Sequence, residues 1–112
     1  LTKLNLENNE FEGELPEFGL GSNINTLILG GNEFQGDFPT SYASLSSLQT
    51  LDLRANKLAG TIPSLELFED LIALFLNDNE FTGDFPELNP DNTIYELNAS
   101  NNFFSGTIPP SI

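Results

Sequence analysis

The chain has 112 residues, with 17 acidic side chains against three basic ones and a formal net charge of −14. A surface this acidic repels phosphate, which argues against nucleic acid and against an anionic membrane as partners. Cysteine and histidine are both absent. This excludes disulfides, cysteine nucleophiles, histidine triads and most zinc sites, so we expect no metal and no cofactor.

The chain aligns with itself in five units, which cover residues 1–23, 24–47, 48–70, 71–93 and 94–112. With the first residue of each unit counted as position 0, positions 3 and 5 are apolar, position 8 is Asn, position 10 is Phe or Leu, position 12 is Gly and position 15 is Pro. Such recurrence in register predicts a single array of structural repeats.

Each unit begins with apolar residues that alternate with polar ones, which predicts a short strand with one inward face. One repeat cannot bury its own apolar face, so the repeats stack and their strands form a parallel sheet. The Asn that follows should turn the chain and bond its amide to the backbone of adjacent turns. These residues are Asn9, Asn32, Asn56, Asn79 and Asn102.

The apolar residue before each proline, such as Phe38 or Phe85, predicts a second short strand that ends at the proline. After the proline the units vary. Tyr42 and Leu45 in the second unit, and Leu65 and Phe68 in the third, have the spacing of one helical turn with a buried face. The first and fourth units lack this spacing, and we expect irregular structure there.

The stretches NKLAGTIP (Asn56 to Pro63) and NNFFSGTIP (Asn101 to Pro109) resemble the signature of the leucine-rich repeat family, in its plant-type class. The resemblance covers the whole chain. It implies an α/β-type repeat solenoid: a right-handed coil with a concave parallel β-sheet, short second strands and a 3-10 or irregular convex side. Ectodomains of this class usually carry cysteine-paired caps, which are absent here, so we expect a fragment of a longer array.

The resemblance also implies a recognition module without catalytic activity, as found in receptor-like kinases, receptor-like proteins and secreted inhibitors. A protein or peptide ligand and a location outside the cell or at its surface follow from it. Any kinase domain of the parent chain would lie elsewhere. An intracellular interaction scaffold is the alternative with the same fold.

Positions 2, 4 and 6 should face solvent on the concave side, where the fold needs no apolar residue. Ile28 and Phe75 at position 4 therefore predict a contact patch, and the charged Asp52 and Arg54 lie between them. Single exposed apolar residues are also common without a function. The predicted ligand-binding residues are Ile28, Asp52, Arg54, Ala73, Phe75, Asn77 and Tyr95.

Acidic residues recur at positions 9 and 13, and we expect Glu10 and Glu33 to be neighbours across the array. No compact calcium-binding loop is present, so a solvated flank screened by salt explains them better. The triplet Asn98-Ala99-Ser100 is a glycosylation sequon, which matters if the parent chain is secreted.

Two remote alternatives use the same coil. A carbohydrate-active site would need paired carboxylates flanking a cleft, for which Asp52, Asp78, Glu7 and Glu96 are candidates, with Asp52 and Asp78 in adjacent repeats. The regular repeats offer no loop insertion to build that cleft. An ice-binding surface would need an unbroken threonine row, but Asp84 separates Thr61 from Thr107 at position 13.

Overall fold

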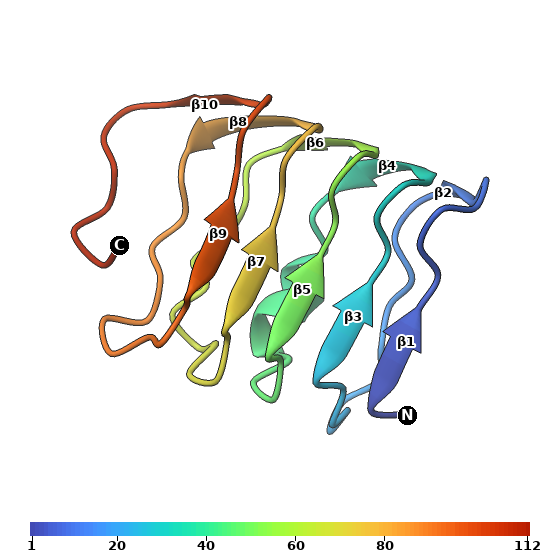
Figure 1. Ribbon diagram of the computed structural model, residues 1–112, viewed down its shortest axis with the longest axis horizontal. Coiled ribbons are helices and arrows are strands. Elements are labelled where there is room, and N and C mark those ends of the chain that lie inside the picture. Colours follow the sequence, from blue (N-terminus) through green and yellow to red (C-terminus); the bar gives the residue numbers. More distant parts are fainter.

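The computed structural model describes residues 1–112 as a coil of short strands (Figure 1). The odd-numbered strands form one parallel sheet in the order β1-β3-β5-β7-β9, and the even-numbered strands form a second in the order β10-β8-β6-β4-β2. No helix is long and apolar enough to cross a membrane. The first sheet consists of β1 (Lys3–Asn5), β3 (Thr26–Ile28), β5 (Thr50–Asp52), β7 (Ala73–Phe75) and β9 (Glu96–Asn98), and the second of β2 (Glu12–Gly13), β4 (Glu33–Asp37), β6 (Lys57–Gly60), β8 (Glu80–Asp84) and β10 (Phe103–Ser105).

The first sheet, which we call the concave sheet, pairs each residue with the same position of the next repeat. Leu27, for example, pairs with Leu51, and Leu51 with Leu74. These three side chains are fully buried, whereas Leu4 and Leu97 in the outer strands are only partly buried. A strand therefore needs a neighbour on both sides to bury its apolar face, as the repeat pattern predicts.

The second sheet has a different register, because each strand is shifted by two residues against its neighbour. Position 11 of one repeat pairs with position 9 of the next, as Ala59 does with Glu80. Glu12 therefore lies directly opposite Glu33. Glu10, two residues before Glu12, is offset along the strand from Glu33, and their closeness across the array stays a prediction.

The strands of the second sheet also end earlier than the sequence predicts. β4 stops at Asp37 and β8 at Asp84, one residue before Phe38 and Phe85. Phe38 turns into the core and is buried there. The proline that follows has no N–H with which to continue a ladder, so the strand cannot reach it.

The asparagine ladder links successive turns as the sequence predicts. In Asn79 the Oδ1 atom accepts the N–H of Leu58 from the preceding repeat at 3.1 Å. Its Nδ2 donates to the carbonyl of Leu53, also in the preceding repeat, at 2.9 Å, and to Leu76 in its own repeat at 3.3 Å. Asn32, Asn56 and Asn102 repeat this pattern.

The convex side is regular in only one repeat. A 3-10 helix, η1 (Thr40–Ser44), follows Pro39 and places Tyr42 and Leu45 in the core. The third repeat buries Leu65 and Phe68 through a single turn, in which Phe68 N–H donates to the Leu65 carbonyl at 3.1 Å. The predicted helical turn is thus a 3-10 helix in the second repeat and an isolated turn in the third.

Tyr42 makes the stability of the second repeat sensitive to alkaline pH. Its hydroxyl is buried and donates to the Pro16 carbonyl. Burial, with a smaller contribution from the charge of Glu17, raises the pKa of Tyr42 well above its usual value. The pKa is higher in the folded state than in the unfolded state. The stabilisation is therefore complete below about pH 10 and is lost as the pH rises toward the folded pKa.

We expect Tyr42→Phe to cost about 1 kcal/mol at neutral pH, through the lost hydrogen bond. The same variant should lose less stability than the unmodified chain between about pH 8 and about pH 11. Urea unfolding of the variant and of the unmodified chain, each at about pH 8 and at about pH 11, measures the two losses of stability. Parallel losses in the two chains would show that Tyr42 is not the group responsible.

Candidate ligand-binding face

The register of the concave sheet brings three of the predicted contact residues side by side. Ile28 pairs with Asp52, and Asp52 pairs with Phe75, at the ends of β3, β5 and β7. Arg54 follows Asp52 by two residues, so its side chain emerges on the same face. Ile28 and Phe75 are half-buried, because neighbouring side chains cover part of each.

Arg54 closes over Asp52 and Phe75, and we call these three residues the Arg54 cluster. Its Nε donates to Asp52 Oδ2 at 2.9 Å, and its Nη2 lies 2.7 Å from the same oxygen. The backbone N–H of Arg54 donates to Asp52 Oδ1 at 3.1 Å. The guanidinium carbon lies 4.5 Å from the centre of the Phe75 ring, within the range of a cation–π contact.

Burial differs sharply within the Arg54 cluster. Asp52 is 2% exposed, whereas the Arg54 side chain is 45% exposed. The guanidinium covers the carboxylate and offers its own outer surface to solvent. The ion pair is partly shielded from water, and two guanidinium nitrogens contact the same carboxylate oxygen. These contacts hold the arginine in one orientation.

Gly30 provides room for the Arg54 cluster, and the sequence did not single it out. A Cβ at Gly30 would lie 3.0 Å from Arg54 Cγ and 3.0 Å from Asp52 Oδ1. A side chain there would push against both partners of the ion pair. Gly30 is at position 6 of the second repeat, and Arg54 is at the same position of the third. No turn requires glycine at position 6, so this glycine was the signal in the sequence that a neighbouring side chain needs room.

Asn77 and Asp78 form a second polar group at the edge of this face. Asn77 is 8% exposed and donates from Nδ2 to Asp78 Oδ2 at 2.8 Å, while its own Oδ1 is buried without a partner. Asn101 donates to Asp78 Oδ1 at 2.7 Å. These two hydrogen bonds, that from Asn77 first, lower the pKa of Asp78.

Asp52 and Asp78, the candidate acids in adjacent repeats, do not meet the needs of glycoside hydrolysis. That reaction requires one carboxylic acid whose pKa is raised so that it can donate a proton. Asp78 has its pKa lowered, and Asp52 is engaged by Arg54. Neither acid is placed to donate a proton to a substrate.

The two remaining predicted residues lie apart from the Arg54 cluster. Ala73 begins β7 and is buried, so it offers little surface to a ligand. Tyr95 is 74% exposed and precedes β9, whereas Phe75 pairs with Asn98 at the other end of that strand. The geometry thus gathers Ile28, Asp52, Arg54, Phe75 and Asn77 toward one end of the concave strands.

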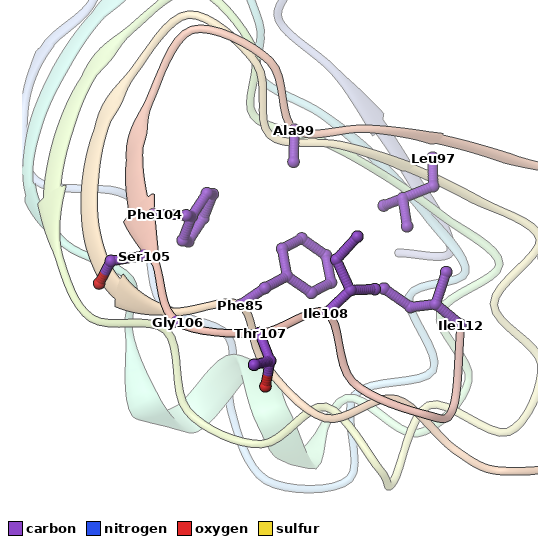
Figure 2. A pocket seen from close by; sticks show the side chains of 9 residues that line it. All are labelled: Phe85, Leu97, Ala99, Phe104, Ser105, Gly106, Thr107, Ile108 and Ile112. Carbon is purple, nitrogen blue, oxygen red and sulfur yellow. The ribbon is translucent and has the colours of Figure 1, made fainter.

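A separate apolar hollow of about 420 Å³ opens beside the last turn of the coil. Figure 2 shows Phe85, Leu97 and Ile108 turned toward it, while Ser105 and Thr107 point away. Leu97, Phe104 and Ile108 occupy repeat positions that are filled by buried residues in the middle repeats, such as Leu51, Leu58 and Ile62. The hollow is thus the cross-section of the core at the end of the coil, and it does not include the Arg54 cluster.

Solved structures share this coil. The PEPR1–AtPEP1 structure is 31% identical over 99% of this chain, with a TM-score of 0.92. The LRR ectodomain of the plant membrane receptor kinase GASSHO1/SCHENGEN3 from Arabidopsis thaliana, in complex with CASPARIAN STRIP INTEGRITY FACTOR 2, is 30% identical over 96% with a TM-score of 0.82. The plant peptide hormone receptor RGFR1 in complex with RGF2 is 27% identical over 100% with a TM-score of 0.86. The chain spans only 16%, 13% and 18% of these three structures, respectively.

Comparison with known sequences agrees with the comparison of structures. No curated protein sequence matches the chain significantly. The Leucine Rich Repeat family model matches residues 1–20, 47–66 and 93–112, which is more than half of the chain. The structure agrees with those matches, because successive repeats are joined by two parallel sheets and by the asparagine ladder. The chain therefore belongs to the leucine-rich repeat family, and its fold is that of plant receptor kinase ectodomains.

Proposed function

We propose that this chain is a peptide- or protein-recognition segment of a cell-surface or secreted receptor-like protein, and that the ligand contacts the concave sheet around the Arg54 cluster. The observation that carries the proposal is the guanidinium of Arg54, held over Phe75 by a buried Asp52. Arginine and aromatic residues are the usual energetic centres of protein interfaces.

The geometry favours binding because it reduces the entropic cost of ordering the contact residues. A free arginine side chain loses about 0.5 to 1.5 kcal/mol when a ligand immobilises it. Here Asp52 and Phe75 already hold Arg54 in place. A peptide can then use the exposed guanidinium edge for its carbonyl or carboxylate groups, with Ile28 and Phe75 supplying apolar contact.

The similar structures support the class of ligand. One is described as a plant peptide hormone receptor in complex with RGF2, and another as an ectodomain in complex with CASPARIAN STRIP INTEGRITY FACTOR 2. A location at the cell surface, and five repeats within a longer array, belong to the same proposal. The small fraction of those structures that this chain spans supports the longer array.

The size of the concave sheet sets an expectation for affinity. Five strands about 4.8 Å apart and about 15 Å across present roughly 360 Å². A stable interface needs about 800 Å² per partner. We therefore expect weak binding from these 112 residues alone.

The test is selection of peptides from a randomised display library on the immobilised chain, followed by titration of the selected peptides against variants. Phe75→Ala should weaken their binding about tenfold, because it removes both an apolar contact and the support of Arg54. Leu67→Ala is the matched control, since Leu67 is exposed and lies outside the concave sheet. Peptides that bind the Phe75→Ala chain as tightly as the unmodified chain would overturn the proposed site.

The cellular location has an independent test. The transcript that encodes this segment shows whether a secretion signal precedes it and whether a spanning helix follows. Finding them supports a receptor ectodomain. A complete reading frame without a leader or a membrane segment would favour the intracellular scaffold.

A further inference from the structure

Asn98 is the last residue of β9 and lies exposed on the concave sheet. It opens the sequence Asn98-Ala99-Ser100, in which an asparagine is followed two residues later by a hydroxyl side chain. This triplet is the acceptor sequence for N-linked glycans. Modification also needs an asparagine whose side-chain nitrogen is available and whose surroundings tolerate a bulky sugar.

The local geometry meets the first of these needs. Ser100 donates twice to Asn98 Oδ1, from its backbone N–H at 3.0 Å and from its hydroxyl at 2.8 Å. Both bonds engage the oxygen of the amide, and Nδ2 makes no hydrogen bond to the protein. The asparagines of the ladder differ, because Nδ2 of Asn79 donates to three carbonyl groups.

The position in the fold meets the second need. Asn98 is exposed and is not among the residues that form the hydrophobic core. Ala99 between the two polar residues turns inward, so the asparagine and the serine share the solvent side of the turn. A sugar attached at Nδ2 would extend into solvent without displacing packed atoms.

Asn5 provides an internal comparison. It ends β1 at the same repeat position, is also exposed, and accepts the N–H of Glu7 on Oδ1 at 3.0 Å. The residue two places after it is Glu7, which has no hydroxyl, so Asn5 is not in an acceptor triplet. The two sites differ chiefly in that third residue.

We propose that Asn98 is an N-glycosylation acceptor. In the reaction, Nδ2 attacks the anomeric carbon of an oligosaccharide carried on a lipid pyrophosphate. The new N–C bond replaces the C–O bond to the pyrophosphate, which leaves with the electron pair, and the amide loses one proton. The donor belongs to the secretory pathway, so occurrence in the native cell rests on the proposed location of the parent protein.

The glycan would also limit the ligand-binding face. Asn98 pairs with Phe75 in the concave sheet, so the sugar would stand directly beside the Arg54 cluster on the side of the fifth repeat. Ligands would then approach the cluster from the side of β3, where Ile28 lies.

The experiment is secretion of the chain behind a general signal peptide from a eukaryotic cell, with intact-mass measurement before and after treatment with an amidase that releases N-glycans. Most molecules should lose mass on treatment, and peptide mapping should place the resulting aspartate at position 98. Ser100→Ala should abolish the glycan, whereas Ser100→Thr should retain it. Glu7→Ser should add a second glycan at Asn5.

A secreted chain that carries no glycan at Asn98 would overturn the inference. A glycan at Asn5 in the Glu7→Ser chain would show that the cell modifies this fold and would make that result decisive. Retention of the glycan in Ser100→Ala would overturn it as well. Because the added signal forces entry into the secretory pathway, these outcomes do not depend on where the parent protein resides. Peptide binding by the unglycosylated chain is measured separately, so failure of the proposed function is recognised independently.

Discussion

Replacement of Asn79 by alanine should lower the free energy of unfolding by about 3 kcal/mol, a large share of the 5 to 15 kcal/mol that holds a typical domain together. Asn79 is only 6% exposed and bonds to the backbone of two repeats. Urea unfolding followed by far-ultraviolet circular dichroism measures the loss.

The size of this effect follows from which backbone groups lose their partners. The carbonyls of Leu53 and Leu76 keep other donors, Asn56 and Asn102 respectively. The buried N–H of Leu58 loses its acceptor, the Oδ1 atom of Asn79. An unsatisfied buried donor costs about 1 to 3 kcal/mol, and the three lost bonds from Nδ2 add to that cost.

Asn9→Ala is the matched control. Asn9 is exposed, and its amide donates only to Leu6 and Glu7 within its own repeat. We expect a loss below about 1 kcal/mol. Equal losses at both positions would show that the bonds between repeats contribute nothing beyond the local turn.

Gly83→Ala should cost about 2 to 3 kcal/mol, for two separable reasons. The backbone of Gly83 has φ of 78°, a left-handed conformation that disfavours any residue with a Cβ. An added Cβ would also lie 2.8 Å from Cγ2 of Thr61 in the preceding repeat. The side chain at position 13 of one repeat thus lies over the glycine of the next.

Gly13→Ala separates the two contributions. Gly13 has φ of 86°, but an added Cβ there would meet no atom within 4 Å. We therefore expect a loss of about 1 kcal/mol, from the backbone conformation alone. If both variants lose the same stability in urea, Thr61 moves aside freely and the contact between repeats carries no cost.

The parts of the fold that recur in every repeat were predictable from the sequence. The position of the leucines gave the concave sheet, and the register of Leu27, Leu51 and Leu74 confirms it. The role of the asparagines followed from their place at the end of each strand. These features repeat because every turn must bury its apolar side chains against its neighbours and satisfy the hydrogen bonds of its backbone.

The register of the second sheet and the order of burial within the Arg54 cluster were not predictable in the same way. The two-residue shift of the second sheet is invisible in an alignment that places equal positions together, so the sequence did not show that Glu12 faces Glu33 or that Gln35 faces Lys57. Asp52 was expected to face solvent and is instead buried beneath Arg54. The sequence placed Asp52, Arg54 and Phe75 on one face but did not show which side chain covers which.

The decrease in burial toward the two ends of the coil has a consequence for its motions. Each repeat contacts only its neighbours, so in these 112 residues alone we expect local opening to begin at the outer turns. Amide hydrogens of β1 and β9 should exchange with solvent earlier than those of β5, whose Leu51 is fully enclosed. Asp52 and Phe75 end β5 and β7, and Arg54 lies just beyond β5, so we expect the Arg54 cluster to keep its shape when the outer strands open.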